Sequence, residues 1–510
     1  SLSYAELESQ SNQLAHYLMG QGVKPDVCVA IALERSIQCI VSMMAIFKAG
    51  GAYVPLDINA PLDRLSFMLE ETQAVLIITS KQWMDSINTE DNDVFAQTSK
   101  LYLDADVADI EKQSTDVPKN QLFAHHLAYV IYTSGSSGKP KGVMITHGNL
   151  LDYCYGAINQ YALTHQDRVL QFATISFDAS IEEIFPTLMV GACLVLRNEN
   201  MLADANTFFD LARSLQLTVL SLPTAYWHSL CQQLNDEVNQ GQLRLVIIGG
   251  EKALPEPLRN WQNKFSSDIK LLNTYGPTES TVVTSVFDLT EFQADELPIG
   301  QAFPNRLLYV VNPDHPSQLM PIGVPGELCV AGNGLARGYL QRQSLEQQKF
   351  IINPFSNDPT RRMYRTGDKV CYLSDGNLVF LGRIDDQVKI RGFRVELGEI
   401  ETVINQLPQI DECVVVAKPD ASQTLQIIAY VVTHHVLNDD AESLSITELR
   451  NSLKENLPDY MLPVQLLEIP HLPLTSHGKV DKRALPKVNL SDSQEEYQAP
   501  RNSIEERLVE

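Results

Sequence analysis

The sequence lacks any uninterrupted run of about 18 apolar residues, so it offers no candidate for a membrane-spanning helix. It is also poor in positive charge, with 39 Lys and Arg against 63 Asp and Glu and a formal net charge of −24. That balance argues against nucleic acid or an anionic membrane as a partner, because both repel a strongly acidic protein. No signal peptide precedes the first helical pattern, and we expect a cytoplasmic protein.

Metal-binding patterns are also missing. The eight cysteines form no C-x-x-C pair, and no histidine cluster lies near them at metal-ligand spacing. We interpret them as small core residues in a reducing compartment. The hydrophobic fraction of 44% and the length of 510 residues indicate a globular protein of two or more domains. The chain begins at Ser1 directly in a helical pattern, and we interpret it as a piece of a longer polypeptide.

Strand-like and helical patterns alternate along the first three quarters of the chain. Apolar runs at 27–32, 74–79, 218–222 and 245–249 are separated by segments of helical period such as 4–19. This alternation predicts α/β layers with mostly parallel strands. From residue 326 the pattern changes to short strands with Gly and Asp turns, and a second βα pattern follows further on.

The segment Tyr132–Gly142 reads Y-T-S-G-S-S-G-K-P-K-G and follows an apolar strand-like run. Its glycines let backbone amides turn toward a phosphate, its hydroxyl groups can donate hydrogen bonds, and its lysines can neutralise negative charge. It is not a Walker loop, because no G-K-[ST] closes it at the required spacing. On composition alone, a flexible surface turn is an equally good interpretation.

Four further strings are each compatible with an ordinary turn or a charged linker. They are N-T-Y-G-P-T-E at 273–279, Y-R-T-G-D at 364–368, a cation-rich string at 382–400 and S-H-G-K-V-D-K at 476–482. In this order, and after the Gly/Ser/Lys loop, they resemble the motifs of the adenylate-forming superfamily. That group includes acyl-CoA synthetases, luciferases and the adenylation domains of nonribosomal peptide synthetases. The last string departs from the family at His477, where Asn is usual, and at Lys482, where Arg is commoner.

Other strings resemble the synthetase branch, and they include Lys48–Pro55, Phe177–Ser180 and Leu457–Pro463. The resemblance implies an α/β fold whose large N-terminal subdomain, 1–383, has several layers, mostly parallel sheets and a small barrel-like part. A small mobile α+β C-terminal subdomain at 384–487 should act as a lid. Residues 488–510 should be a linker and the truncated start of a carrier domain, because 497–502 resembles the run-in to one.

The resemblance also implies the reaction and the residues that carry it. A carboxylate attacks the α-phosphorus of ATP to give an adenylate and pyrophosphate, and a carrier-bound phosphopantetheine thiol then takes the acyl group. The residues expected to bind ATP or AMP are Thr133, Ser134, Gly135, Ser136, Ser137, Gly138, Lys141, Asn273, Tyr275, Gly276, Asp368, Phe380 and Arg383. The expected catalytic residues are Lys479, Thr278, Glu279 and Arg394, with Glu279 also binding Mg²⁺ and Asp385 as the hinge.

The substrate is expected to be an amino acid, because an unpaired buried carboxylate at Asp178 would be costly without an α-ammonium group beside it. The positions expected to contact the substrate are Asp178, Ala179, Glu182, Ser221, Ile247, Gly249, Thr274, Val282 and Val283. Glu182 would be the charge that reads the side chain, unless it points to solvent as most glutamates do. If it points inward, it needs a donor, which favours arginine as substrate, with tyrosine second. The pairing of Glu182 with Ser221 resembles the first adenylation domain of an anabaenopeptin-type synthetase.

Two alternatives are carried forward. An acyl- or aryl-CoA ligase would use free coenzyme A, and Asp178 and the carrier run-in argue against it. A catalytically silent docking domain is the alternative from another class, and the filled phosphate and lysine positions argue against it. The sequence leaves open whether a helper protein of the MbtH type is required.

Overall fold

The computed structural model describes residues 1–87, 93–135, 138–265, 267–420, 423–433, 446–474 and 480–488. The chain divides into two compact units, Ser1–Gly135 with Lys139–Arg394, and Ser136–Gly138 with Val395–Glu510. The division therefore follows Arg394, later than the expected boundary after residue 383. The reason is that the segment before Arg394 packs on the large unit. The Gly392 amide donates to the Glu251 carboxylate at 2.5 Å, and the Phe393 ring lies 4.6 Å from that of Phe177.

The large unit contains two sheets of seven strands each. The first sheet has, in spatial order, β16 (Gly338–Tyr339), β6 (Lys141–Thr146), β5 (Leu127–Thr133), β2 (Ala52–Pro55), β1 (Cys28–Ala32), β3 (Leu76–Thr79) and β4 (Ser99–Tyr102). The second has β13 (Gln301–Ala302), β12 (Ser285–Asp288), β11 (Lys270–Tyr275), β10 (Leu245–Gly249), β9 (Val219–Pro223), β7 (Arg168–Gln171) and β8 (Cys193–Leu196). Strands β1 to β5 pair in parallel, as do β7 to β11, which confirms the expected parallel sheets.

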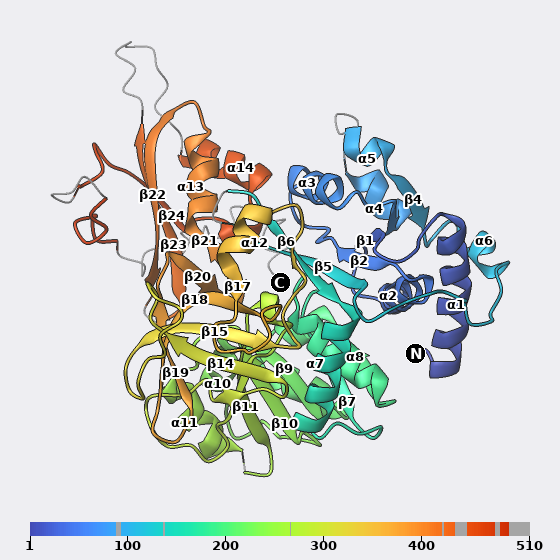
Figure 1. The fold of residues 1–510 in the computed structure, drawn as a ribbon, viewed down its shortest axis with the longest axis horizontal. Coiled ribbons are helices and arrows are strands. Elements are labelled where there is room, and N and C mark those ends of the chain that lie inside the picture. Colours follow the sequence, from blue (N-terminus) through green and yellow to red (C-terminus); the bar gives the residue numbers. More distant parts are fainter. Residues whose placement is uncertain are drawn as a thin grey trace, which may run out of the picture. The chain divides into compact units, whose positions relative to one another are not determined.

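A shared core joins the inner faces of the two sheets. It contains β-strand residues of both sheets together with residues of α1 (Tyr4–Gly20), α2 (Ile37–Ala49), α7 (His147–Gln160) and α8 (Ala179–Met189). Successive strand residues point to opposite faces, so Val219 and Ile247 join this core whereas Leu220 and Val246 join the next one. Figure 1 shows α7 and α8 beside the strands of the second sheet.

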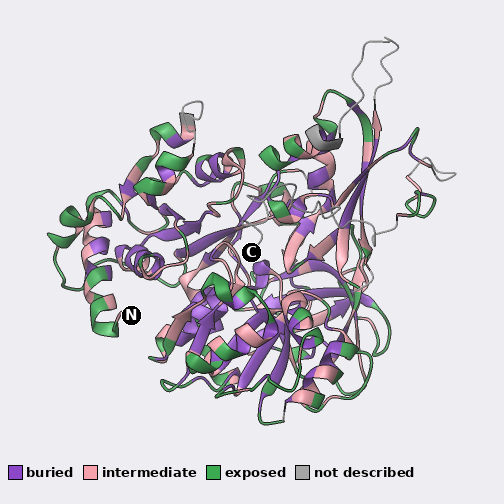
Figure 2. Cartoon of the chain, turned by 180° about the vertical axis from the view of Figure 1, so that it is seen from behind, coloured by how far each residue is buried: buried purple, intermediate pink, exposed green. Residues whose placement is uncertain are grey.

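Each sheet is covered on its other face by further helices. The helices that pack with the outer face of the first sheet are α3 (Leu62–Thr72), α4 (Lys81–Ser86) and α5 (Asp93–Gln97). Those that pack with the outer face of the second are α9 (Ala205–Ser214), α10 (Thr224–Gln232) and α11 (Pro255–Lys264), with the short η1 (Glu199–Leu202). Figure 2 shows the strands buried and the outward sides of these helices exposed. The short α6 (Val107–Glu111) contacts α1.

A third sheet of five strands follows, and it is the part that the sequence predicts from its short strands. Its order is β14 (Arg306–Val311), β15 (Gly326–Gly332), β18 (Arg362–Tyr372) and β17 (Phe350–Ile352), with β19 (Leu378–Arg383) pairing on β18. The pairs within this sheet are antiparallel. Its core includes Tyr275 from the second sheet, which places the end of β11 against it. Helix α12 (Gln343–Lys349) packs on β16 and β17.

The small unit has its own sheet and core. Strands β22 (Ile410–Pro419), β23 (Leu425–Thr433) and β24 (Gln465–Glu468) form the sheet, and α13 (Leu397–Asn405) packs on β22. The small unit also contains α14 (Ile446–Asn456) and the short η3 (Asp459–Met461). A two-stranded ribbon of β20 (Gln387–Ile390) and β21 (Phe393–Glu396) includes the point at which the chain passes from one unit to the other. This α/β fold with a large sheet-containing subdomain and a smaller C-terminal one is the fold class that the sequence predicts.

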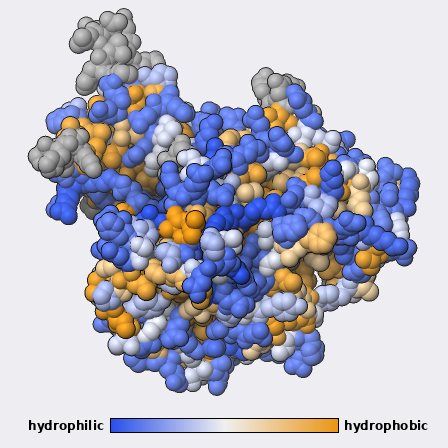
Figure 3. Space-filling model, in the orientation of Figure 1, coloured by the Kyte–Doolittle hydropathy of each residue, from blue (hydrophilic) through white to orange (hydrophobic). Residues whose placement is uncertain are grey.

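No helix among the described residues is long and apolar enough to cross a membrane. The face of the molecule in Figure 3 is mostly hydrophilic, with hydrophobic side chains in small groups. All eight cysteines are free thiols, and Cys28, Cys39, Cys154, Cys231 and Cys329 are buried. Most of them are therefore core residues, as expected.

Candidate active site

The Gly/Ser/Lys loop connects the antiparallel strands β5 and β6. Thr133 at the end of β5 pairs with Lys141 at the start of β6, so the loop reverses the chain direction between these two residues. The Thr133 hydroxyl is buried and has no hydrogen-bond partner among the described residues. A buried polar atom without a partner costs free energy, so this hydroxyl is suited to a ligand. Gly138 has a φ of 79°, in the left-handed region that glycine adopts freely. Ser136 and Ser137 lie outside the described residues.

Glu279 is fully buried in η2 (Thr278–Ser280) and is surrounded by donors. Its carboxylate lies 2.6 Å from the Arg394 guanidinium and 3.4 Å from the Lys141 ammonium, and it accepts from the Tyr339 hydroxyl at 2.7 Å. Burial alone would raise its pKa, but the charges of Arg394 and Lys141 outweigh this effect and hold the pKa of Glu279 well below its usual range. Three of the predicted residues, Lys141, Glu279 and Arg394, are thus brought together in one buried ionic cluster.

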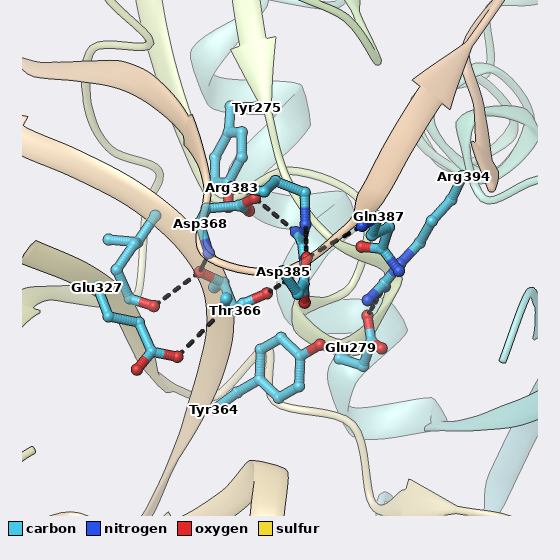
Figure 4. Close-up of polar contacts among 12 residues, drawn as sticks. Tyr275, Glu279, Glu327, Tyr364, Thr366, Asp368, Arg383, Asp385, Gln387 and Arg394 are labelled. Atoms are coloured by element: carbon cyan, nitrogen blue, oxygen red, sulfur yellow. Dashed lines mark hydrogen bonds and ion pairs between the residues drawn. The ribbon is translucent and has the colours of Figure 1, made fainter. Parts of the chain in front are cut away.

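A second cluster gathers the residues expected around the adenosine. The Tyr275 hydroxyl donates to the Asp368 carboxylate, and Arg383 donates to the same carboxylate at 2.5 Å. Arg383 also grips Asp385 through two hydrogen bonds of 2.5 and 2.7 Å. Figure 4 shows these side chains converging near the Thr366–Asp368 segment of β18, with Glu279 and Arg394 nearby. The expected hinge residue Asp385 therefore lies within the large unit, and its side chain is paired with Arg383 of the same unit.

The other predicted nucleotide residues lie on β11 and β19 or directly after β5 and β11. The Phe380 ring, on β19, has its centroid 6.5 Å from that of Tyr275. Asn273 is buried on β11, and its amide donates to the Pro298 carbonyl at 2.8 Å. Ser134 donates to the Arg394 carbonyl at 2.7 Å. Gly276 is required by close packing, because a Cβ there would lie 2.0 Å from the Val282 carbonyl oxygen.

Asp178 stands at the N-cap of α8, yet its side chain makes no capping hydrogen bond. An N-cap Asp ordinarily accepts from the first turn of its helix, so this carboxylate is directed elsewhere. Desolvation raises the pKa of Asp178 to about 6, although hydrogen bonding from Thr278 and the positive charge of Lys389 oppose the rise. The carboxylates of Glu279 and Glu182 add to it. Asp178 thus lies where a positively charged group would be stabilised.

The residues expected to read the side chain are carried by neighbouring elements of one core. Ser221 on β9 pairs with Ile247 on β10, and Gly249 pairs with Thr274 on β11. Ile247, Val282 and Val283 belong to the core between the sheets. Ala179 begins α8, one turn before Glu182. Thr281 and Val282 have φ values of 59° and 65°, a conformation that β-branched residues rarely adopt.

Glu182 is buried, which excludes the interpretation that it points to solvent. Its Oε1 accepts from the hydroxyls of Tyr153 at 3.1 Å and Tyr161 at 2.5 Å, and its Oε2 accepts from Ser221 at 2.7 Å. A buried carboxylate at this position was expected to require a hydrogen-bond donor, and three hydroxyl groups of the chain supply donors to Glu182. A substrate guanidinium is therefore not needed to satisfy Glu182 in the free protein.

Four residues near these clusters were not singled out from the sequence. Tyr153 and Tyr161 bind Glu182, Tyr339 binds Glu279, and Lys389 lies with its ammonium 5.8 Å from the centre of the Tyr275 ring. Lys389 had a signal, since it belongs to the cation-rich string at 382–400. The predicted catalytic Lys479 lies outside the described residues.

Comparison with known proteins gives matches along the whole chain. Residues 1–340 match the family model described as AMP-binding enzyme, and residues 399–479 match the AMP-binding enzyme C-terminal domain. The chain is 41% identical over 513 aligned positions to a linear gramicidin synthase of Brevibacillus parabrevis. That alignment covers all of this chain but only 6% of the synthase, so the chain spans a small part of this much longer relative.

Two solved structures are similar at the level of the fold and the sequence. A nonribosomal peptide synthetase protein containing adenylation and PCP domains, bound to a vinylsulfonamide inhibitor, superposes with a TM-score of 0.80 at 27% identity. The match covers 95% of this chain and 79% of that one. A four-domain nonribosomal peptide synthetase bound to AMP and glycine is 32% identical, with a TM-score of 0.66, over 99% of this chain and 36% of that one.

Proposed function

Because the chain belongs to the AMP-binding enzyme family, we propose that it activates an amino acid with ATP, giving an aminoacyl-adenylate and pyrophosphate, as part of a nonribosomal peptide synthetase. The similar synthetases along the whole chain support the proposal. In this role the protein supplies position and charge stabilisation rather than covalent chemistry.

Asp178 is the observation that carries the choice of an amino acid. Its carboxylate is released from capping and its pKa is raised to about 6, chiefly by desolvation. An α-ammonium group beside it would favour the ionised form. The substrate of an acyl- or aryl-CoA ligase has no α-ammonium group, so it would leave this carboxylate without a cationic partner from the substrate.

The nucleotide would be held by residues of both clusters. The Thr133 hydroxyl is a buried donor without a partner among the described residues, and Lys141 is a buried cation at the start of β6, which suits them to phosphate oxygens. Tyr275 would lie against the adenine with Phe380, and Asp368 would accept from the ribose hydroxyls in place of Tyr275. Arg383 would keep the Asp368 carboxylate oriented, since it already donates to it.

Magnesium fits this site only through a single protein carboxylate. Among the described residues, no group of three His, Cys, Asp or Glu side chains could hold a metal. Mg²⁺ is commonly bound by one or two carboxylates together with phosphates and water, and Glu279 can supply one. Arg394 occupies that carboxylate here, so it would have to release Glu279 when the metal–nucleotide complex binds.

For the side chain of the amino acid we propose arginine first and tyrosine second. Glu182 is buried beside Ser221, and Ile247, Val282 and Val283 provide apolar surface for methylenes or a ring. A guanidinium would pair with the carboxylate as an ion, and a phenol would donate one hydrogen bond to it. The resemblance to an anabaenopeptin-type first domain rests on the same pair of residues and stays a prediction.

The second half-reaction would transfer the aminoacyl group to the phosphopantetheine thiol of a carrier domain. The inhibitor-bound relative contains adenylation and PCP domains, which supports a carrier partner for this chain. Lys479 would act in adenylate formation and the segment ending at Arg394 in transfer, with the small unit moving between the two steps.

Exchange of labelled pyrophosphate into ATP, measured with each of the twenty amino acids, tests the proposal. We expect exchange to depend on an amino acid, with arginine leading or sharing the lead with tyrosine. Dependence on a carboxylic acid without an α-amino group, with coenzyme A as acceptor, would establish the ligase alternative instead. Normal folding with no exchange for any acid would establish the docking alternative.

A further inference from the structure

We propose that Tyr153 and Tyr161 are positioning residues that set the charge and direction of Glu182, and thereby decide whether the enzyme takes a cationic or a phenolic side chain. The inference rests on the proposed function and goes beyond the residues that would touch the substrate. Tyr153 lies on α7 and Tyr161 caps its C-terminal end, so both act on Glu182 from the helix that neighbours α8.

The hydroxyl groups of the two tyrosines both hydrogen-bond the Glu182 carboxylate. Both are buried, and both donate to Oε1 of Glu182. Their rings pack on Phe303, with centroids 5.6 Å away for Tyr153 and 6.3 Å for Tyr161. The rings are thus held by packing, and the hydroxyls can be removed without emptying the space.

The hydrogen bonds leave Glu182 with limited capacity for a ligand. A carboxylate offers about four acceptor positions, and the chain fills three of them. Oε1 accepts both tyrosines, whereas Oε2 accepts Ser221 alone. A phenol needs one position and can use the open one on Oε2. A guanidinium fork needs two, so it would also take the position of Ser221, whose hydroxyl can rotate.

The same hydrogen bonds control the ionisation of Glu182. Desolvation raises the pKa of this carboxyl, and the hydroxyls of Tyr161, Ser221 and Tyr153 oppose the rise by stabilising the ionised form. A guanidinium needs the ionised form. A phenol can donate to the ionised form or accept from the protonated one, so its binding depends little on that charge.

Glu182 also has two titratable neighbours on its own helix. Asp178 and Glu183 are both carboxyls whose pKa values are raised, mainly by desolvation and in smaller part by Glu182. Glu183 has a pKa of about 8 and accepts from Gln171 and the Ala173 amide. From α7 the facing groups are Tyr153 and Tyr161, and from β9 the facing group is Ser221.

The test is the ratio of kcat/KM for arginine to kcat/KM for tyrosine, measured by pyrophosphate exchange across pH. Asp178 and ATP affect both substrates alike, so the ratio isolates Glu182. In the parent the ratio should fall as the pH falls through the pKa of Glu182. In Tyr161→Phe that fall should occur about one pH unit higher, because a hydrogen bond to the charged form is lost. Tyr153→Phe should act in the same direction.

Tyr53→Phe is the matched control, because Tyr53 is a fully buried tyrosine of the same core whose hydroxyl has no partner among the described residues. It should leave the pH dependence of the ratio unchanged. Glu183→Gln should preserve the displacement between parent and Tyr161→Phe, which excludes titration of the neighbouring carboxyl as its source.

The outcomes separate the inference from the proposed function. An unshifted ratio in both Tyr→Phe variants, or an equal shift in Tyr53→Phe, would overturn the inference while leaving amino-acid activation intact. A parent that activates another amino acid but neither arginine nor tyrosine would do the same. Loss of the proposed function would appear as no exchange in the parent with any amino acid.

Discussion

Asp178 and Glu182 lie one turn apart at the start of α8, and each has a raised pKa for the same main reason, which is lost hydration. They differ in their partners. Three hydroxyls hold Glu182, whereas Asp178 makes no capping hydrogen bond and has a pKa of about 6. One helix start therefore presents one carboxylate that three hydroxyls of the chain hold and another, hydrogen-bonded by Thr278, that a cationic group would stabilise further.

This difference predicts a pH dependence that all amino-acid substrates share. A carboxyl with a raised pKa is ionised only above that pKa, so the attraction for an α-ammonium group is present above about pH 6 and lost below it. We expect the KM for arginine and the KM for tyrosine both to rise as the pH falls from about pH 8 to about pH 5, measured by exchange. The rise for tyrosine reports Asp178, because phenol binding depends little on the charge of Glu182. Asp178→Asn should remove this dependence and lower kcat/KM by about 10² or more. A KM that stays constant through pH 6 in the parent would exclude the role of Asp178.

The cluster at Glu279 predicts an effect on stability. Glu279→Gln would leave the buried cations Lys141 and Arg394 without their counter-charge, and breaking such a pair costs about 3–5 kcal/mol of the free energy of unfolding. Because the pKa of Glu279 is lowered, its stabilising charge is present above the pKa of the unfolded chain and is lost only as the pH falls through the lower folded value.

Urea unfolding near neutral pH measures this loss, and Glu346→Gln provides the control. Glu346 pairs with Arg362 at 3.1 Å, but both side chains are about one-third exposed. Such a pair contributes about 0–1 kcal/mol, so the control should unfold almost as the parent does. Equal destabilisation by the two substitutions would show that the Glu279 cluster is not a buried ion pair in solution.

At the scale of elements, the ribbon of β20 and β21 is the feature that the sequence describes least well. The cation-rich string at 382–400 predicts a domain boundary, and the structure divides the units within it, but after Arg394. The sequence could not show this, because the contacts that hold the ribbon come from distant segments. Glu251 binds Gly392, and Phe177 packs on Phe393.

The hinge prediction belongs to this element. We expect Asp385→Pro to fix the backbone there and to impair transfer to a carrier thiol while pyrophosphate exchange survives. Asp385→Asn is the matched variant, because it weakens the pairing with Arg383 and leaves the backbone free. Exchange and loading of a purified carrier domain are measured for both. Loss of both activities in each variant would indicate that the Arg383 pairing, rather than a hinge, is what matters.

At the scale of the whole molecule, the periodicity of the sequence was enough to predict the fold, and its motifs were enough to predict part of the site. The strand and helix periods predict the layered α/β fold. The prediction of an adenylate-forming ligase is confirmed by the family to which the chain belongs. The motif residues Tyr275, Asp368 and Arg383 do meet. Tyr153 and Tyr161 could not be identified from the sequence, because they belong to no motif. Only the packing of α7 on α8 brings them to Glu182.

Val282 has a consequence for how this enzyme can evolve. Its backbone is left-handed, with a φ of 65°, and most residues with a Cβ are strained in that conformation. Mutations at this position are therefore filtered by the main chain before the substrate can favour or reject them. Gly and Asn relieve the strain most readily. In the substrate site proposed above, the substitutions that the backbone tolerates at Val282 would therefore make the site wider or more polar. A larger apolar wall would have to arise at Ile247 or Val283, where the backbone imposes no such filter.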